Sequence, residues 1–110
     1  MVAITEQNRA ALAQLCRQYR VRTLYLFGSA TSDRFDPSRS DLDFLVCFAD
    51  RQPNGEYANR HLGFAEDIER LFNRPIDLVT EQSIRNPYLR HEIESTRQLV
   101  YEQPHEETAI

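Results

Sequence analysis

The chain has 110 residues, of which 41% are hydrophobic and 27% are charged, and its formal net charge is −4 at pH 7. This length fits one domain with a single core, and the ordinary composition excludes wholesale disorder and a fibrous repeat. The negative charge disfavours broad attraction to nucleic acid, and the sequence shows neither a membrane-spanning stretch nor a signal-peptide pattern, so we expect a cytoplasmic protein.

Helical and strand-like patterns alternate along the chain. Apolar residues recur at three- and four-residue spacing in two long segments, which predicts helices, and Pro87 is a suitable first residue for a short third helix. Four shorter runs rich in β-branched, aromatic and other apolar residues predict strands. The expected elements are a helix over Thr5–Tyr19 with Thr5 as N-cap, a strand over Thr23–Phe27, a polar loop over Thr31–Ser40, a strand over Leu42–Phe48, a helix over Tyr57–Phe72, a strand over Ile76–Val79, a short helix over Pro87–Glu94 and a strand over Gln98–Tyr101.

This order predicts an α/β fold in which helices flank a small mixed sheet. We expect residues 1–102 to form the single domain and residues 103–110 to form a flexible tail. Cys16 and Cys47 lie in apolar segments and form no C-x-x-C pair, so they are predicted to be buried free thiols.

Two acidic residues at the start of the second strand are the first candidates for chemistry. Asp41 and Asp43 are two positions apart, and the pleat of a strand directs alternate side chains to one face. Like charges held close together repel each other, whereas a divalent cation between them favours both ionised forms. Magnesium prefers such hard oxygen ligands and commonly completes its shell with substrate phosphates.

A third acid, Asp77, interrupts the apolar run of the third strand. An unpaired charge there is costly unless it faces a metal ion or a hydrogen-bond donor. Three carboxylates from two neighbouring strands can seat two metal ions for in-line displacement at phosphorus, and Asp77 is then a candidate general base as well as a ligand.

Gly28 and Ser29 follow the first strand directly. Glycine lets the backbone approach a phosphate closely, and the Ser29 hydroxyl and nearby backbone N–H groups can donate to phosphate oxygens. A Gly-Ser pair alone is weak evidence, but the arrangement with Asp41, Asp43 and Asp77 is much more specific.

The pattern Leu26-Phe27-Gly28-Ser29, followed by Ser40-Asp41-Leu42-Asp43-Phe44-Leu45-Val46, resembles the nucleotidyltransferase signature of the polymerase-β superfamily. The small size is similar to that of its minimal members, and the resemblance covers nearly the whole chain. It implies the polymerase-β-like nucleotidyltransferase fold, Mg²⁺ as cofactor and ATP as substrate. The matching positions are Gly28 and Ser29 for the nucleotide, and Asp41, Asp43 and Asp77 as metal-binding and catalytic residues.

Many minimal members of this superfamily are antitoxins paired with an all-helical HEPN-domain ribonuclease toxin, and some attach AMP to a toxin tyrosine. The resemblance therefore implies a hetero-oligomer with such a toxin and transfer of AMP from ATP to its tyrosine. Family members often have arginine and glycine soon after Gly-Ser, whereas this chain reads Ala30-Thr31-Ser32-Asp33. Two alternatives stay open: an antitoxin that neutralises the toxin by binding alone, and an enzyme that modifies a small molecule such as an antibiotic.

Overall fold

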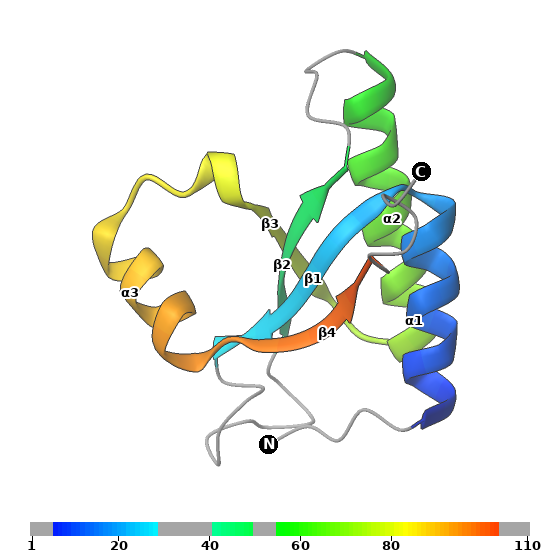
Figure 1. The fold of residues 1–110 in the computed structure, drawn as a ribbon, viewed down its shortest axis with the longest axis horizontal. Helices are drawn as coiled ribbons and strands as arrows, with labels where there is room; N and C mark the ends of the chain where they lie inside the picture. The colour runs from blue at the N-terminus through cyan, green and yellow to red at the C-terminus, as the bar shows by residue number, and fades with distance from the viewer. Residues whose placement is uncertain (1–5, 29–40, 50–54, 104–110) are drawn as a thin grey trace.

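The computed structural model describes residues 6–28, 41–49 and 55–103, where three α-helices surround a four-stranded sheet (Figure 1). The predicted order of elements is confirmed, and a short 3-10 helix is added to it. None of the helices in these ranges is long and apolar enough to cross a membrane. The elements are α1 (Glu6–Gln18), β1 (Val21–Phe27), β2 (Leu42–Phe48), α2 (Gly55–Phe72), β3 (Ile76–Thr80), the 3-10 helix η2 (Glu81–Ser83), α3 (Pro87–Thr96) and β4 (Gln98–Glu102).

The sheet has the strand order β3-β2-β1-β4. Strand β1 runs antiparallel to both of its neighbours, β2 and β4, whereas β2 and β3 are parallel. A parallel pair needs a crossover connection, and α2 supplies it between β2 and β3. The α/β fold with a small mixed sheet is therefore confirmed.

Helices cover both faces of the sheet. Figure 1 shows α1 and α2 side by side on one face and α3 on the opposite side. Side chains of β2 alternate accordingly: Phe44 and Val46 contact the main core under α1 and α2, whereas Leu45 belongs to a smaller cluster under α3. This double coverage explains why β2 is an almost continuous apolar run in the sequence.

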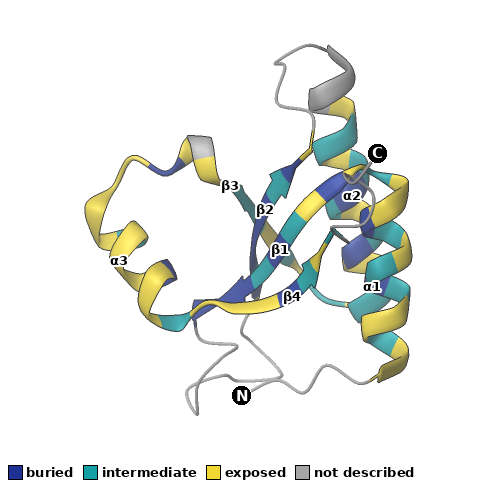
Figure 2. Cartoon of the chain, in the orientation of Figure 1, coloured by how far each residue is buried: buried dark blue, intermediate teal, exposed yellow. Residues whose placement is uncertain are grey.

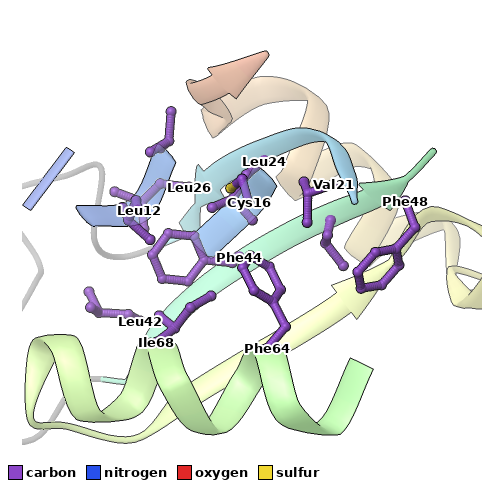
Figure 3. Close-up of a cluster of buried hydrophobic side chains, with 12 residues drawn as sticks. Leu12, Cys16, Val21, Leu24, Leu26, Leu42, Phe44, Phe48, Phe64 and Ile68 are labelled. Carbon is purple, nitrogen blue, oxygen red and sulfur yellow. The ribbon is translucent and has the colours of Figure 1, made fainter. Parts of the chain in front are cut away.

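The main core lies between the sheet and the two long helices (Figure 3). Leu12 and Cys16 of α1 and Phe64 and Ile68 of α2 are fully buried, at the helical spacing expected from the sequence. The second cluster contains Phe27, Leu45, Ile84 and Ile93. Figure 2 shows that α3, which contributes to this cluster, is exposed over most of its surface.

Local backbone features mark the ends of the helices. Arg20 and Asn73 follow α1 and α2 in the left-handed region, with φ of 59° and 54°, a conformation that commonly ends helices. Helix α3 begins as predicted at Pro87, and the Asn86 side chain accepts a hydrogen bond from the Tyr88 backbone N–H. The predicted N-cap Thr5 and the predicted tail residues 104–110 lie outside the described residues.

Both cysteines are free. Cys16 is buried, and burial raises the pKa of its thiol to about 12. Cys47 is only half-buried, because it lies on the face of β2 that the short helix α3 covers incompletely.

Candidate active site

Asp43 and Asp77 lie directly beside each other on neighbouring strands. The parallel register of β2 and β3 pairs Asp43 with Asp77, and paired residues of adjacent strands project to the same face. On that face the next pair along the strands is Leu45 with Val79, and both belong to the cluster under α3. The sheet therefore brings these two predicted carboxylates together on the side of α3.

Gly28 borders the same carboxylate from the other neighbouring strand. Asp43 pairs with Phe27, the last residue of β1, and Gly28 follows immediately with a φ of +78°, which L side chains rarely adopt. A Cβ atom built on Gly28 would lie 2.8 Å from Asp43 Oδ2, closer than such contacts occur. Both the backbone conformation and the close approach of Asp43 thus favour glycine at this position.

The electrostatics of the site centre on Asp43. Burial, as the largest cause, and the charges of Asp77, Glu92 and Asp41 together raise the pKa of its carboxyl group to about 6. Because the folded state holds this proton more tightly than the unfolded chain, the contribution of Asp43 to stability is lost as pH rises from about 4 to about 6. Ionised Asp43 therefore sits in a place that favours a cation.

Helix α3 contributes two residues that sequence reasoning missed. The Glu92 carboxylate comes near the site, since its Oε1 atom would lie 3.6 Å from a Cβ built on Gly28. The Thr96 hydroxyl accepts a hydrogen bond of 2.9 Å from the Gly28 N–H. Helical spacing places Thr96 on the same stripe as Leu89 and Ile93, but that spacing does not indicate a contact with Gly28.

The other two predicted site residues, Asp41 and Ser29, are not placed in the site by the strand register. Asp41 is exposed and precedes β2, and its charge acts on Asp43. Ser29 and the predicted loop over Thr31–Ser40 lie outside the described residues. Across the described ranges, no three His, Cys, Asp or Glu side chains are grouped closely enough to hold a metal ion. Metal binding by Asp41, Asp43 and Asp77 therefore stays a prediction.

Carboxylates on two parallel strands, beside a glycine turn at the end of a third, can hold a cation next to bound phosphates. Comparison with known proteins agrees with this arrangement, since residues 9–100 match the nucleotidyltransferase domain. The chain belongs to the nucleotidyltransferase family. That span includes the candidate active-site residues from Gly28 to Thr96.

Individual relatives of this nucleotidyltransferase point the same way. It is 32% identical over 77 residues to a Methanocaldococcus jannaschii protein named as a putative protein adenylyltransferase, covering 70% of this chain and 74% of the relative. A solved toxin–antitoxin structure with AMP-PNP superposes with a TM-score of 0.64 at 20% identity, covering 96% of this chain and 80% of the other. A tri-AMPylated Shewanella oneidensis HEPN toxin in complex with MNT antitoxin gives a TM-score of 0.61 at 19% identity, covering 94% and 77%. These structural likenesses confirm the nucleotidyltransferase fold.

Proposed function

We propose that this nucleotidyltransferase is an antitoxin that transfers AMP from ATP, with Mg²⁺, to a tyrosine of a cognate HEPN ribonuclease toxin. The observation that carries the proposal is the register that sets Asp43 beside Asp77 next to the Gly28 turn. The name of the Methanocaldococcus jannaschii relative supports AMP as the transferred group. The tri-AMPylated toxin in the Shewanella oneidensis complex supports a HEPN toxin as the acceptor.

By chemical type the three predicted ligands suit a divalent cation, although among the described residues they are not grouped closely enough to hold one. Asp41, Asp43 and Asp77 offer carboxylate oxygens, which are the hard ligands that magnesium prefers. Burial and neighbouring carboxylates disfavour the ionised form of Asp43, and a bound cation reverses that preference. When bound, Mg²⁺ would neutralise negative charge on the triphosphate and on the phosphoryl group in transfer.

Residues of the chain would then bind the triphosphate and accept the proton of the tyrosine. Gly28 lets the backbone come close to the triphosphate, since it carries no side chain between β1 and Asp43. Asp77 accepts the proton of the tyrosine hydroxyl while the tyrosine oxygen forms a bond to the α-phosphorus of ATP. The bond from that phosphorus to pyrophosphate breaks, so that AMP is left on the tyrosine and pyrophosphate leaves.

The test uses the wild type and the double variant Asp41→Asn with Asp43→Asn, each incubated with ATP, Mg²⁺ and the cognate toxin. Intact-mass spectrometry should show toxin with added AMP for the wild type and none for the variant, because the amides cannot hold the cation, and peptide fragmentation should locate the AMP on a tyrosine. The matched control is Glu66→Gln with Glu69→Gln, which neutralises two exposed acids on α2 and should leave the transfer unchanged.

A toxin-binding antitoxin without catalysis is the second candidate. The sequence Ala30-Thr31-Ser32-Asp33 favours it, because the arginine and glycine often found after Gly-Ser in this family are absent. This candidate predicts that the Asp41→Asn, Asp43→Asn variant protects cells as well as the wild type and that neither form adds mass to the toxin. That pair of results would replace the enzymatic proposal with the binding one.

A further inference from the structure

A side chain from α3 holds the backbone of Gly28. The Gly28 N–H donates a hydrogen bond of 2.9 Å to Thr96 Oγ1, although the two residues are 68 positions apart. Thr96 is the last residue of α3, and it is half-buried between that helix and the end of β1. This bond is therefore a tertiary contact that joins α3 to the residue that follows β1.

The direction of the bond is fixed by a second interaction of the same hydroxyl. Thr96 Oγ1 donates to the Glu92 backbone carbonyl at 2.7 Å, one helical turn earlier. A hydroxyl has only one proton to donate, so its oxygen lone pairs remain for the Gly28 N–H. The helix itself thus orients Thr96 to serve as an acceptor for Gly28.

The bond matters because Gly28 has little freedom of position. Its φ of +78° and the Asp43 oxygen next to it define a close approach between the Gly28 backbone and the carboxylate on β2. Gly28 is buried, and its N–H would lose a partner of fixed position without Thr96. Three elements, β1, β2 and α3, therefore meet at this one backbone unit.

We infer that Thr96 is a positioning residue for nucleotide binding, which holds the Gly28 backbone beside Asp43 in the conformation that receives the triphosphate. This inference rests on the proposed function, because it assigns Gly28 to the nucleotide. Thr96 acts through Gly28 and does not itself touch the reacting atoms. Its loss is therefore expected to weaken nucleotide binding more than it slows the chemical step.

The test compares Thr96→Val, which keeps the shape but removes the hydroxyl, with Thr96→Ser, which keeps the hydroxyl. The control is Ser95→Ala: the Ser95 hydroxyl donates to the backbone carbonyl of His91 at 2.8 Å, with the Glu92 carbonyl at 3.2 Å, and both of these contacts lie within α3. Calorimetric titration with Mg²⁺ and α,β-methylene-ATP gives the Kd of each form. The carbon bridge between the α- and β-phosphorus atoms of this analogue cannot be cleaved, so no AMP is transferred. We expect the Kd to rise about five- to tenfold in Thr96→Val and to stay unchanged in the other two variants. This increase corresponds to the loss of about one hydrogen bond.

Kinetics with the toxin should also show that binding is affected more than the chemical step. For Thr96→Val we expect a higher KM for ATP and a kcat within about twofold of the wild type. An unchanged Kd for Thr96→Val, or an equal loss in Ser95→Ala, would overturn the inference while leaving the proposed function intact. Failure of the wild type to bind the analogue would instead overturn the proposed function, and the inference with it.

Amide hydrogen exchange tests the contact in the wild-type chain and without nucleotide. The Gly28 amide should exchange slowly in the wild type and in Thr96→Ser, and faster in Thr96→Val relative to the other β1 amides. Fast exchange of Gly28 in the wild type would overturn the inference, even if Thr96→Val failed to fold.

Discussion

Gly28 shows how a single residue can link backbone geometry to chemistry. Its N–H is held by Thr96, its φ is +78°, and the space where a side chain would begin is taken by Asp43 Oδ2. Each of these constraints comes from a different element of the fold. A residue with a Cβ atom therefore meets both a steric conflict and an unfavourable backbone conformation at the same position.

Gly28→Ala is expected to destabilise the protein by about 1–2 kcal/mol from the left-handed backbone alone, and to displace Asp43. Urea unfolding gives the change in the free energy of unfolding, and titration with Mg²⁺ and α,β-methylene-ATP should show lost affinity. Gly63→Ala is the control for a crowded glycine elsewhere in the protein, because its added methyl group meets the Tyr19 ring at 3.2 Å, between α2 and α1. It should leave nucleotide affinity unchanged. Equal nucleotide affinity in Gly28→Ala and the wild type would contradict the close-approach argument.

The sequence was sufficient to place the acidic pair but not its surroundings. Asp43 and Asp77 could be predicted because a charged residue in an apolar strand is costly and therefore conspicuous. Glu92 and Thr96 could not, since an acid on an exposed helix and a threonine near its end are ordinary there. Their approach to Gly28 depends on how α3 packs on the sheet, which no local pattern encodes.

At the scale of elements, α3 is attached to the sheet by a small contact area. Ile93 is its buried residue, Leu89 is half-buried, and the rest of the helix is largely exposed (Figure 2). The Arg97 guanidinium, just after the helix, lies 4.9 Å from the centre of the Tyr25 ring on β1 and adds a cation–π contact. The position of Thr96 beside Gly28 therefore depends mainly on Ile93.

Ile93→Ala is expected to cost about 2–4 kcal/mol of unfolding free energy, because it opens a cavity in the cluster under α3. Tyr88→Ala on the same helix removes a side chain that is 85% exposed, and it should change stability by less than about 0.5 kcal/mol. Chemical denaturation of both variants measures these values. Similar small losses in the two variants would show that α3 is not held by Ile93.

The boundaries of elements show where sequence patterns lose information. Strand β2 was predicted at its observed bounds because both of its faces are apolar. Helix α3 was predicted to end at Glu94 but extends to Thr96, where the threonine hydroxyl bonds to the Glu92 carbonyl. The short helix η2 was missed, since its three residues are too few to show any periodicity.

At the scale of the whole molecule, charge sets a requirement for the cation. The chain carries a formal net charge of −4, and the face that holds Asp43 and Asp77 also receives the charge of Glu92 and Asp41. A nucleoside triphosphate is itself strongly anionic, so direct contact with these carboxylates is repulsive. We therefore expect the protein to bind nucleotide and metal tightly when both are present, and to bind either one only weakly when it is alone.

Melting curves with ATP alone, Mg²⁺ alone and both together test this requirement. Only the combination should raise Tm strongly, by roughly 10 °C when the ligand is 100-fold above its Kd, because a ligand that binds only the folded state stabilises it by mass action. EDTA should reverse the shift. The Asp41→Asn, Asp43→Asn variant should fold and show no such synergy, since amides neither repel the triphosphate nor hold the cation. An equal shift with ATP alone would place the nucleotide away from these carboxylates, and no shift at millimolar Mg²⁺ and ATP would favour the non-catalytic antitoxin.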